Sequence, residues 1–143
     1  MGGDIVKKYL ILIMTILTAI TIFFFSAQDA IESGKVSNTV YDFLMNFDIT
    51  ATIFAVIPIR KFAHSFIFFI LSFFTCSLLK ILHLKNSYIK SYFLCVIYAC
   101  FDEFHQLFIN GRHGCITDVF IDMIGIMIGI ILVAILTRLK KED

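Results

Sequence analysis

The sequence predicts an all-α protein: a polytopic membrane four-helix bundle with a short amphipathic interfacial helix between its first and second spans. Of the 143 residues, 59% are hydrophobic and only 16% are charged, and the mean hydropathy is +0.92. Soluble domains usually carry about 25% charged residues, so this composition is typical of an integral membrane protein. Four apolar stretches each approach the length that a helix needs to cross a bilayer: 9–25, 59–82, 91–109 and 118–136.

The first stretch follows Lys7 and Lys8, as the apolar part of a signal peptide would. The run is long, and the residues after it lack a small-x-small cleavage pattern, which favours a retained helix. The second stretch follows Pro58, and proline fits well in the first turn of a helix, so we expect that helix to begin there. No repeat or linker divides the chain, which predicts a single domain over 1–143.

A helical apolar stripe lies between the first two stretches and predicts the amphipathic interfacial helix. Its members are Val36, Val40, Phe43, Leu44 and Phe47.

Lysine and arginine predict the orientation. If the N-terminus is cytoplasmic, the inner segments hold Lys7, Lys8, Lys80, Lys85, Lys90, Arg138, Lys140 and Lys141, and the outer segments hold Lys35, Arg60, Lys61 and Arg112. Positive residues concentrate on the cytoplasmic side of membrane proteins. The sequence therefore predicts a multi-pass membrane protein with both termini cytoplasmic.

The third stretch contains two adjacent acids, Asp102 and Glu103, inside an apolar run. An ionised carboxylate near the centre of a membrane helix costs roughly 2.5–3.5 kcal/mol, so we expect compensating partners. Asp102, His105 and Gln106 are spaced to share one helix face, whereas Glu103 lies about 100° away and is expected to meet a different neighbour.

The other stretches place their polar residues at the same, outer end. Ser26 and Gln28 close the first stretch, and Arg60, Lys61 and His64 open the second. Arg112 lies in the loop before the fourth stretch. On that stretch Asp118 and Asp122 share a face with Gly125 and Gly129, a GxxxG pair of the kind that lets membrane helices approach closely. We therefore expect these groups to gather in one outward-facing pocket.

Together these residues form three motifs: Ser26-Ala-Gln28; the RKxAH element from Arg60 to His64; and DExxQ from Asp102 to Gln106, followed by Gly111-Arg112, Asp118, Asp122, Gly125 and Gly129. Their order resembles the VanZ-like family, named after an accessory membrane protein of glycopeptide resistance. The resemblance implies a four-helix protein of the bacterial plasma membrane. The namesake lowers sensitivity to teicoplanin, a glycopeptide that carries a fatty acyl chain.

Three functions remain open for such a site. The first is an enzyme acting on a lipid or lipid-linked molecule, with acid/base candidates Glu103, Asp102, His64 and His105. The second is a protein that binds a lipid or a lipoglycopeptide without chemistry. Substrate-binding candidates for both are Arg60, Lys61, Gln106, Arg112, Asp118, Asp122, Ser26 and Gln28. The third is an ion-linked transporter, which is disfavoured because the inner half of the bundle lacks polar residues.

The alternative to these functions is a salt-bridge network that only fixes the bundle. The carboxylates with His64 and His105 could also hold a hard divalent cation, but their spacing matches no known ligand pattern. No metal site and no cofactor are therefore assigned from the sequence. The bilayer is the expected partner, nucleic acid is not, and the oligomeric state stays open.

Overall fold

The computed structural model describes residues 2–29, 35 and 59–142. Within them the chain is helical and contains no strand, which confirms the all-α prediction. The helices are α1 (Gly2–Ala27), α4 (Ile59–Ile81), α5 (Ser87–Gln106) and α6 (Ile116–Glu142). The predicted interfacial helix over 36–47 lies outside the described residues, as does Pro58, the residue directly before α4.

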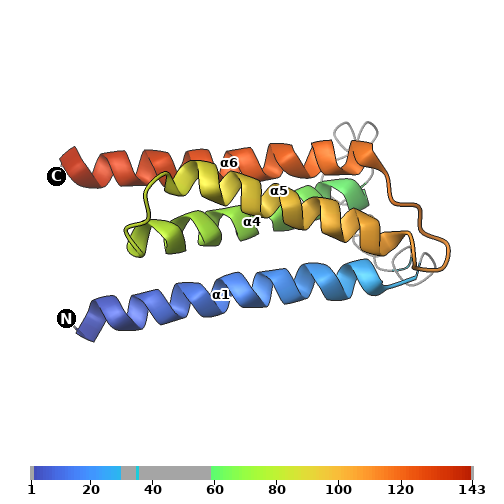
Figure 1. The fold of residues 1–143 in the computed structure, drawn as a ribbon, viewed down its shortest axis with the longest axis horizontal. Helices are drawn as coiled ribbons and strands as arrows, with labels where there is room; N and C mark the ends of the chain where they lie inside the picture. The colour runs from blue at the N-terminus through green and yellow to red at the C-terminus, as the bar shows by residue number, and fades with distance from the viewer. Residues whose placement is uncertain (1, 30–34, 36–58, 143) are drawn as a thin grey trace, which may run out of the picture.

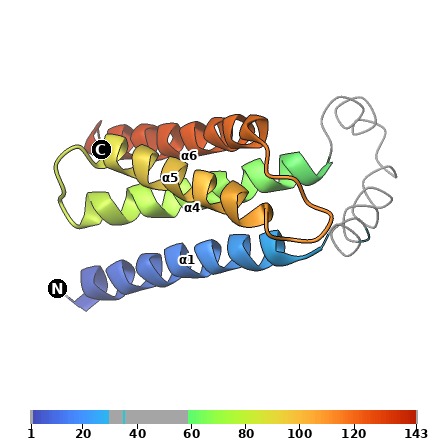
Figure 2. The same cartoon turned by 45° about the vertical axis from the view of Figure 1, so that its right-hand side comes forward.

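The helices run side by side, with α4 and α5 between α1 and α6 (Figures 1 and 2). The most extensive contact joins α4 to α6, and α1 rests mainly on α4. Both ends of the chain and the α4–α5 turn lie at one end of the bundle (Figure 1). The opposite end, where α1 and α5 finish and α4 and α6 begin, is called the polar end below.

Three of these helices, α1, α4 and α6, are long and apolar enough to cross a membrane. The remaining described helix, α5, does not meet this criterion, although the stretch 91–109 was predicted to span the membrane. The difference arises because its 20 residues include three charged side chains, Lys90, Asp102 and Glu103. Two of these are buried within the bundle. The helix that is least suited to lipid by composition is thus the one that carries the embedded acids.

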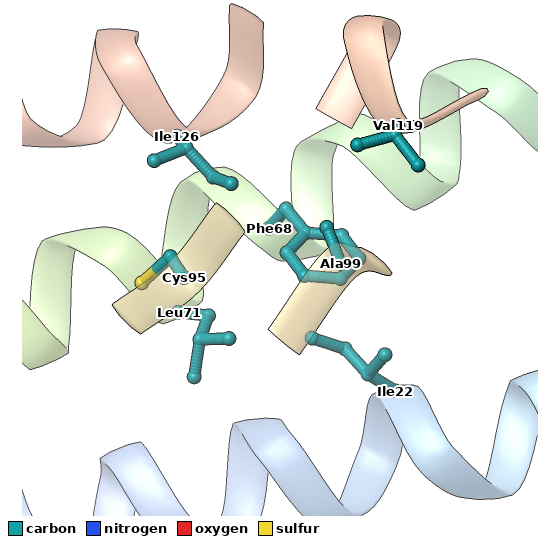
Figure 3. Packing of buried hydrophobic residues seen from close by; sticks show 7 residues of the cluster. All are labelled: Ile22, Phe68, Leu71, Cys95, Ala99, Val119 and Ile126. Atoms are coloured by element: carbon teal, nitrogen blue, oxygen red, sulfur yellow. The ribbon is translucent and has the colours of Figure 1, made fainter. Parts of the chain in front are cut away.

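The apolar core lies between the helices and centres on Phe68 of α4, which is fully buried (Figure 3). Around it pack Leu71 of the same helix and one or more side chains from every other helix: Ile22, Cys95, Ala99, Val119 and Ile126. Large apolar side chains elsewhere point outward along the helices, as expected where lipid is the solvent. The core therefore fixes the helices laterally but leaves their polar end to be organised by other contacts.

Two glycines allow the close contact between α6 and α4. A Cβ atom at Gly125 would overlap the backbone oxygen of Ser65, and one at Gly129 would overlap the Ser72 hydroxyl. Any larger residue would force the backbones apart, which agrees with the packing role predicted for this GxxxG pair. The Ser65 hydroxyl also donates to the Ile121 carbonyl at 2.8 Å, one turn before Gly125.

The α5 helix ends at Gln106, three residues earlier than the predicted boundary at 109. After Gln106 the hydrogen bonds span three residues instead of the four of an α-helix. The backbone amides of Leu107, Phe108 and Ile109 donate to carbonyls three residues earlier at 3.0–3.2 Å. Gly111 then adopts φ 72°, a left-handed conformation that glycine tolerates best. This turn sends the loop back across the polar end toward α6.

Candidate functional site

The polar end holds a cluster of buried polar side chains to which all four helices contribute. It consists of Ser26 from α1, His64 from α4, Asp102, Glu103 and Gln106 from α5, and Asp122 from α6. This set is called the polar cluster below. Each of the three carboxylates is at most 6% exposed. The structure thus brings together six residues that the sequence predicted to share one pocket.

His64 lies at the centre of the polar cluster. Its Nδ1 is 3.0 Å from Oδ2 of Asp122, and its Nε2 is 3.2 Å from Oδ2 of Asp102. One imidazole ring therefore joins α4 to both α5 and α6. The Asp122 carboxylate at Nδ1 fixes the orientation of the ring, so the Nε2 atom is directed at Asp102.

Asp102 is surrounded by donors. The Ser26 hydroxyl donates to its Oδ2 at 2.8 Å, and the Gln106 amide donates to the same oxygen at 2.9 Å. Ser26 Oγ also lies 3.3 Å from His64 Nε2, which ties the end of α1 to the same group. A buried carboxylate needs such bonds, because an unpaired charge in an apolar interior is very costly.

Glu103 was expected to face a different neighbour from Asp102, and it does reach a further element. Its Oε2 accepts the backbone N–H of Cys115 at 2.9 Å, while its Oε1 accepts the Gln106 amide at 3.2 Å. Gly114 allows this approach, since a Cβ there would overlap the Glu103 carbonyl. The sequence analysis missed the Cys115 amide as a partner, because backbone donors leave no residue-type signal.

His105 lies apart from the polar cluster. Its ring stacks on Phe23 of α1, with centroids 4.8 Å apart and an interplanar angle of 24°. Its Nδ1 is buried and has no hydrogen-bond partner among the described residues. His105, which was expected to share one face of the helix with Asp102 and Gln106, therefore contacts α1 rather than the polar cluster, whereas Glu103 accepts a hydrogen bond from Gln106 within it.

The cations are distributed differently from the carboxylates. Lys61 forms an ion pair with Asp118 at the opening of the pocket. Arg60 Nη2 lies 3.4 Å from Gln106 Oε1, and Arg112 donates to the Phe25 carbonyl at 2.9 Å. Within the described part of the chain, neither arginine forms a salt bridge with a carboxylate. Burial lowers the pKa of Arg112 from its usual value, and the nearby charge of Arg60 lowers it further.

A small cavity of about 20 Å³ opens between α4, α5 and α6 at the polar end. It has room for about one water molecule or one small ion. The residues that line it are Arg60, Lys61, His64, Glu103, Gln106, Asp118, Ile121 and Asp122. Gln28 is half-buried just beyond α1, and no hydrogen bond among the described residues joins it to the polar cluster.

A family model described as VanZ/LLP1 matches residues 9–137, which cover nearly all of the chain. The chain belongs to the VanZ/LLP1 family. No curated protein and no solved structure matches it. The resemblance seen in the sequence motifs is thus confirmed, and the apolar helices identify a VanZ-like membrane protein. In this VanZ-like chain the motif residues Ser26, His64, Asp102 and Gln106 meet at one point.

Replacing Ser26 with alanine tests whether the polar cluster holds α1 to the bundle. We expect Ser26→Ala to lower the free energy of unfolding by about 1–3 kcal/mol, because a buried carboxylate loses a donor. Thr21→Ala is the control, since its hydroxyl bonds only the preceding turn of the same helix, at Leu17. SDS-induced unfolding in detergent, monitored by circular dichroism, measures the free energy of unfolding of the two variants and of the wild type. Equal effects of the two variants would contradict the assignment.

Proposed function

We propose that this VanZ-like protein binds the anionic head group of a lipid or lipid-linked cell-envelope molecule at its polar end. The observation that carries the proposal is the pair of arginines, Arg60 and Arg112. Among the described residues both donate only to uncharged oxygens, although acidic side chains lie nearby. Arg112 is only 7% exposed, and no carboxylate of the described residues forms a salt bridge with it. Such a site favours a bound phosphate or carboxylate.

The guanidinium group suits this ligand chemistry. Its planar fork matches the oxygens of a phosphate or carboxylate, and bonds between charged partners are about twice as strong as neutral ones. Lys61 lies beside Arg60 and is half-exposed, although its charge is already shared with Asp118. The polar cluster beneath offers carboxylates and an imidazole, which suit the hydroxyl or amino groups of a larger head group.

The apolar surface beside the polar end suits the hydrophobic tail of such a ligand. Beside the polar end α1 and α5 expose Phe23, Phe24, Phe101 and Phe104, which would meet acyl chains in a bilayer. A membrane lipid, a lipid-linked wall precursor and an acylated glycopeptide of the teicoplanin type share this division into a polar head and an apolar tail. The family assignment supports the last of these, because its namesake lowers sensitivity to teicoplanin.

The site is proposed to face outward from the bacterial plasma membrane. Lys80 and Arg138 lie near the end that holds both termini, together with Lys7 and Lys8. The positive-inside tendency supports a cytoplasmic position for that end. The polar end would then be reached from the outer leaflet and from outside the cell.

Arg60→Gln tests the anion site, because Arg60 is exposed and the change leaves the core intact. We expect affinity for phosphatidylglycerol to fall roughly 10- to 150-fold, since a charge-assisted hydrogen bond contributes about 1.5–3 kcal/mol. Native mass spectrometry of the detergent-purified protein, with phosphatidylcholine as a comparison lipid, measures the change.

Arg138→Gln is the matched control. It removes the same charge from an exposed position of α6 at the opposite end of the bundle. If both variants lose affinity equally, or if wild type does not prefer phosphatidylglycerol over phosphatidylcholine, the anion site is wrong.

Cys115 offers a test of orientation, because it is exposed in the loop at the polar end. We expect a membrane-impermeant maleimide added to intact cells to label wild type and not Cys115→Ser. The remaining cysteines stay unlabelled in that variant because Cys76 and Cys95 are buried, and because Cys100, although exposed on α5, would be covered by lipid if α5 lies within the membrane beside the other helices. Labelling of Cys115 only after the membrane is permeabilised would place the polar end in the cytoplasm.

A second candidate function is acid/base chemistry on the bound ligand. The observation that favours it is the fixed His64 ring, whose neighbours Glu103 and Asp122 line the cavity. Glu103→Gln preserves shape and removes a charge, so we expect it to abolish any change that wild type causes in cellular lipid composition. Lipid profiles that change equally with both proteins would exclude Glu103 from such chemistry.

A further inference from the structure

We propose that His64, Asp102 and Glu103 bind a single divalent metal ion of the Zn²⁺ or Mn²⁺ class. One ligand atom from each residue lies within 4.8 Å of the other two. Ligands placed about 2.1 Å from a tetrahedral or octahedral ion are separated by roughly 3–3.5 Å. The separation of 3.2 Å between His64 Nε2 and Asp102 Oδ2 already falls in that range. Small side-chain rotations would bring Glu103 to the same distance.

The surroundings match those of metal sites in other proteins. A histidine that ligates a metal usually gives its other ring N–H to a carboxylate, and ligating carboxylates are themselves hydrogen-bonded. Here His64 Nδ1 lies 3.0 Å from Asp122, Ser26 donates to Asp102, and the Cys115 amide donates to Glu103. The residues just outside the proposed site are therefore already arranged to orient its three ligands.

The charge balance gives an independent argument. Asp102, Glu103 and Asp122 are buried, yet among the described residues no lysine or arginine forms a salt bridge with any of them. A protonated His64 would contribute one positive charge against three negative ones, and unpaired carboxylates in an apolar bundle are strongly unfavourable. A divalent cation that binds His64 Nε2 displaces the proton of that atom, so the ion supplies two positive charges where the imidazolium supplied one. The net negative charge of these four side chains then falls from two to one.

The Gln106 amide marks where the ion would sit. Its Nε2 bridges the two carboxylates, at 2.9 Å from Asp102 Oδ2 and 3.2 Å from Glu103 Oε1. A cation would replace this N–H bridge and turn the amide aside. The adjacent cavity, lined by His64 and Glu103, would give the ion a path of entry and leave a coordination position for an exogenous oxygen.

The ligand set indicates the kind of metal. One imidazole with two carboxylates suits the borderline ion Zn²⁺ through its nitrogen and the harder Mn²⁺ through its oxygens, whereas Ca²⁺ prefers six to eight oxygens. The inference does not depend on the proposed anion site, because none of its three ligands is Arg60 or Arg112. With the ion bound, His64 Nε2 would be a ligand, and His64 could not serve as a general base through that atom.

Calorimetric titration of the full-length, EDTA-treated protein in detergent with ZnCl₂ and with MnCl₂ tests the site. We expect one ion per chain for at least one of the two metals, with affinity lowered at least tenfold in Glu103→Gln and in His64→Gln. His105→Gln is the matched histidine control and should stay within twofold of wild type. Circular dichroism and size-exclusion chromatography identify any variant that fails to fold. If His64→Gln does not fold, the test depends on Glu103→Gln, which keeps the shape of the side chain.

Two results would overturn the proposal. One is the absence of saturable one-to-one binding of either metal to wild type. The other is unchanged affinity in folded Glu103→Gln, which would assign the ion to other groups. The outcome is separable from that of the anion site: Arg60→Gln should bind the metal like wild type, so either site can fail while the other stands.

Discussion

The burial of three carboxylates inside a bundle of apolar helices is the constraint on which the rest of the structure depends. An apolar core alone does not fix how membrane helices are rotated, since lipid solvates their outer faces equally well. At the polar end, His64 fixes the rotation of α4, α5 and α6, because its ring contacts Asp102 and Asp122 at once. Rotation of α4, α5 or α6 away from this geometry would leave a buried charge unpaired. The same contacts that any function would use therefore also define the arrangement of the helices.

Close packing and the polar cluster are linked through α6. Asp122 precedes Gly125 by three residues, so both lie on the face that α6 presents to α4. Because Gly125 lets the α6 backbone come against Ser65, the adjacent turn brings Asp122 within hydrogen-bond distance of His64. On α4 the two contacting residues, His64 and Ser65, are consecutive. The small residues of the GxxxG pair thus set the distance that the histidine–carboxylate contact requires.

Much of this arrangement could be predicted from the sequence, for identifiable reasons. Long apolar runs predict helices in lipid, and the cost of an embedded charge predicts that Asp102 and Glu103 have partners. The role of His105 could not be predicted, because residues three and four positions apart share a broad face, and only the position of α1 shows that Phe23 covers that histidine. The partner of Arg112 was also beyond prediction, since the Phe25 carbonyl is a backbone group without a sequence signature.

The separation of cations from carboxylates is the feature that a purely structural network explains least well. A network that served only stability would pair the buried Arg112 with an acid of the polar cluster, because an unpaired buried charge is costly. The ion pair of Lys61 is formed with Asp118, which lies at the pocket opening and outside the polar cluster. The arginines instead donate to an amide and a carbonyl. Among the described residues the charges of the arginines and of the buried carboxylates are therefore not paired directly with one another, which is the basis for proposing an anion at the arginines and a cation at the carboxylates.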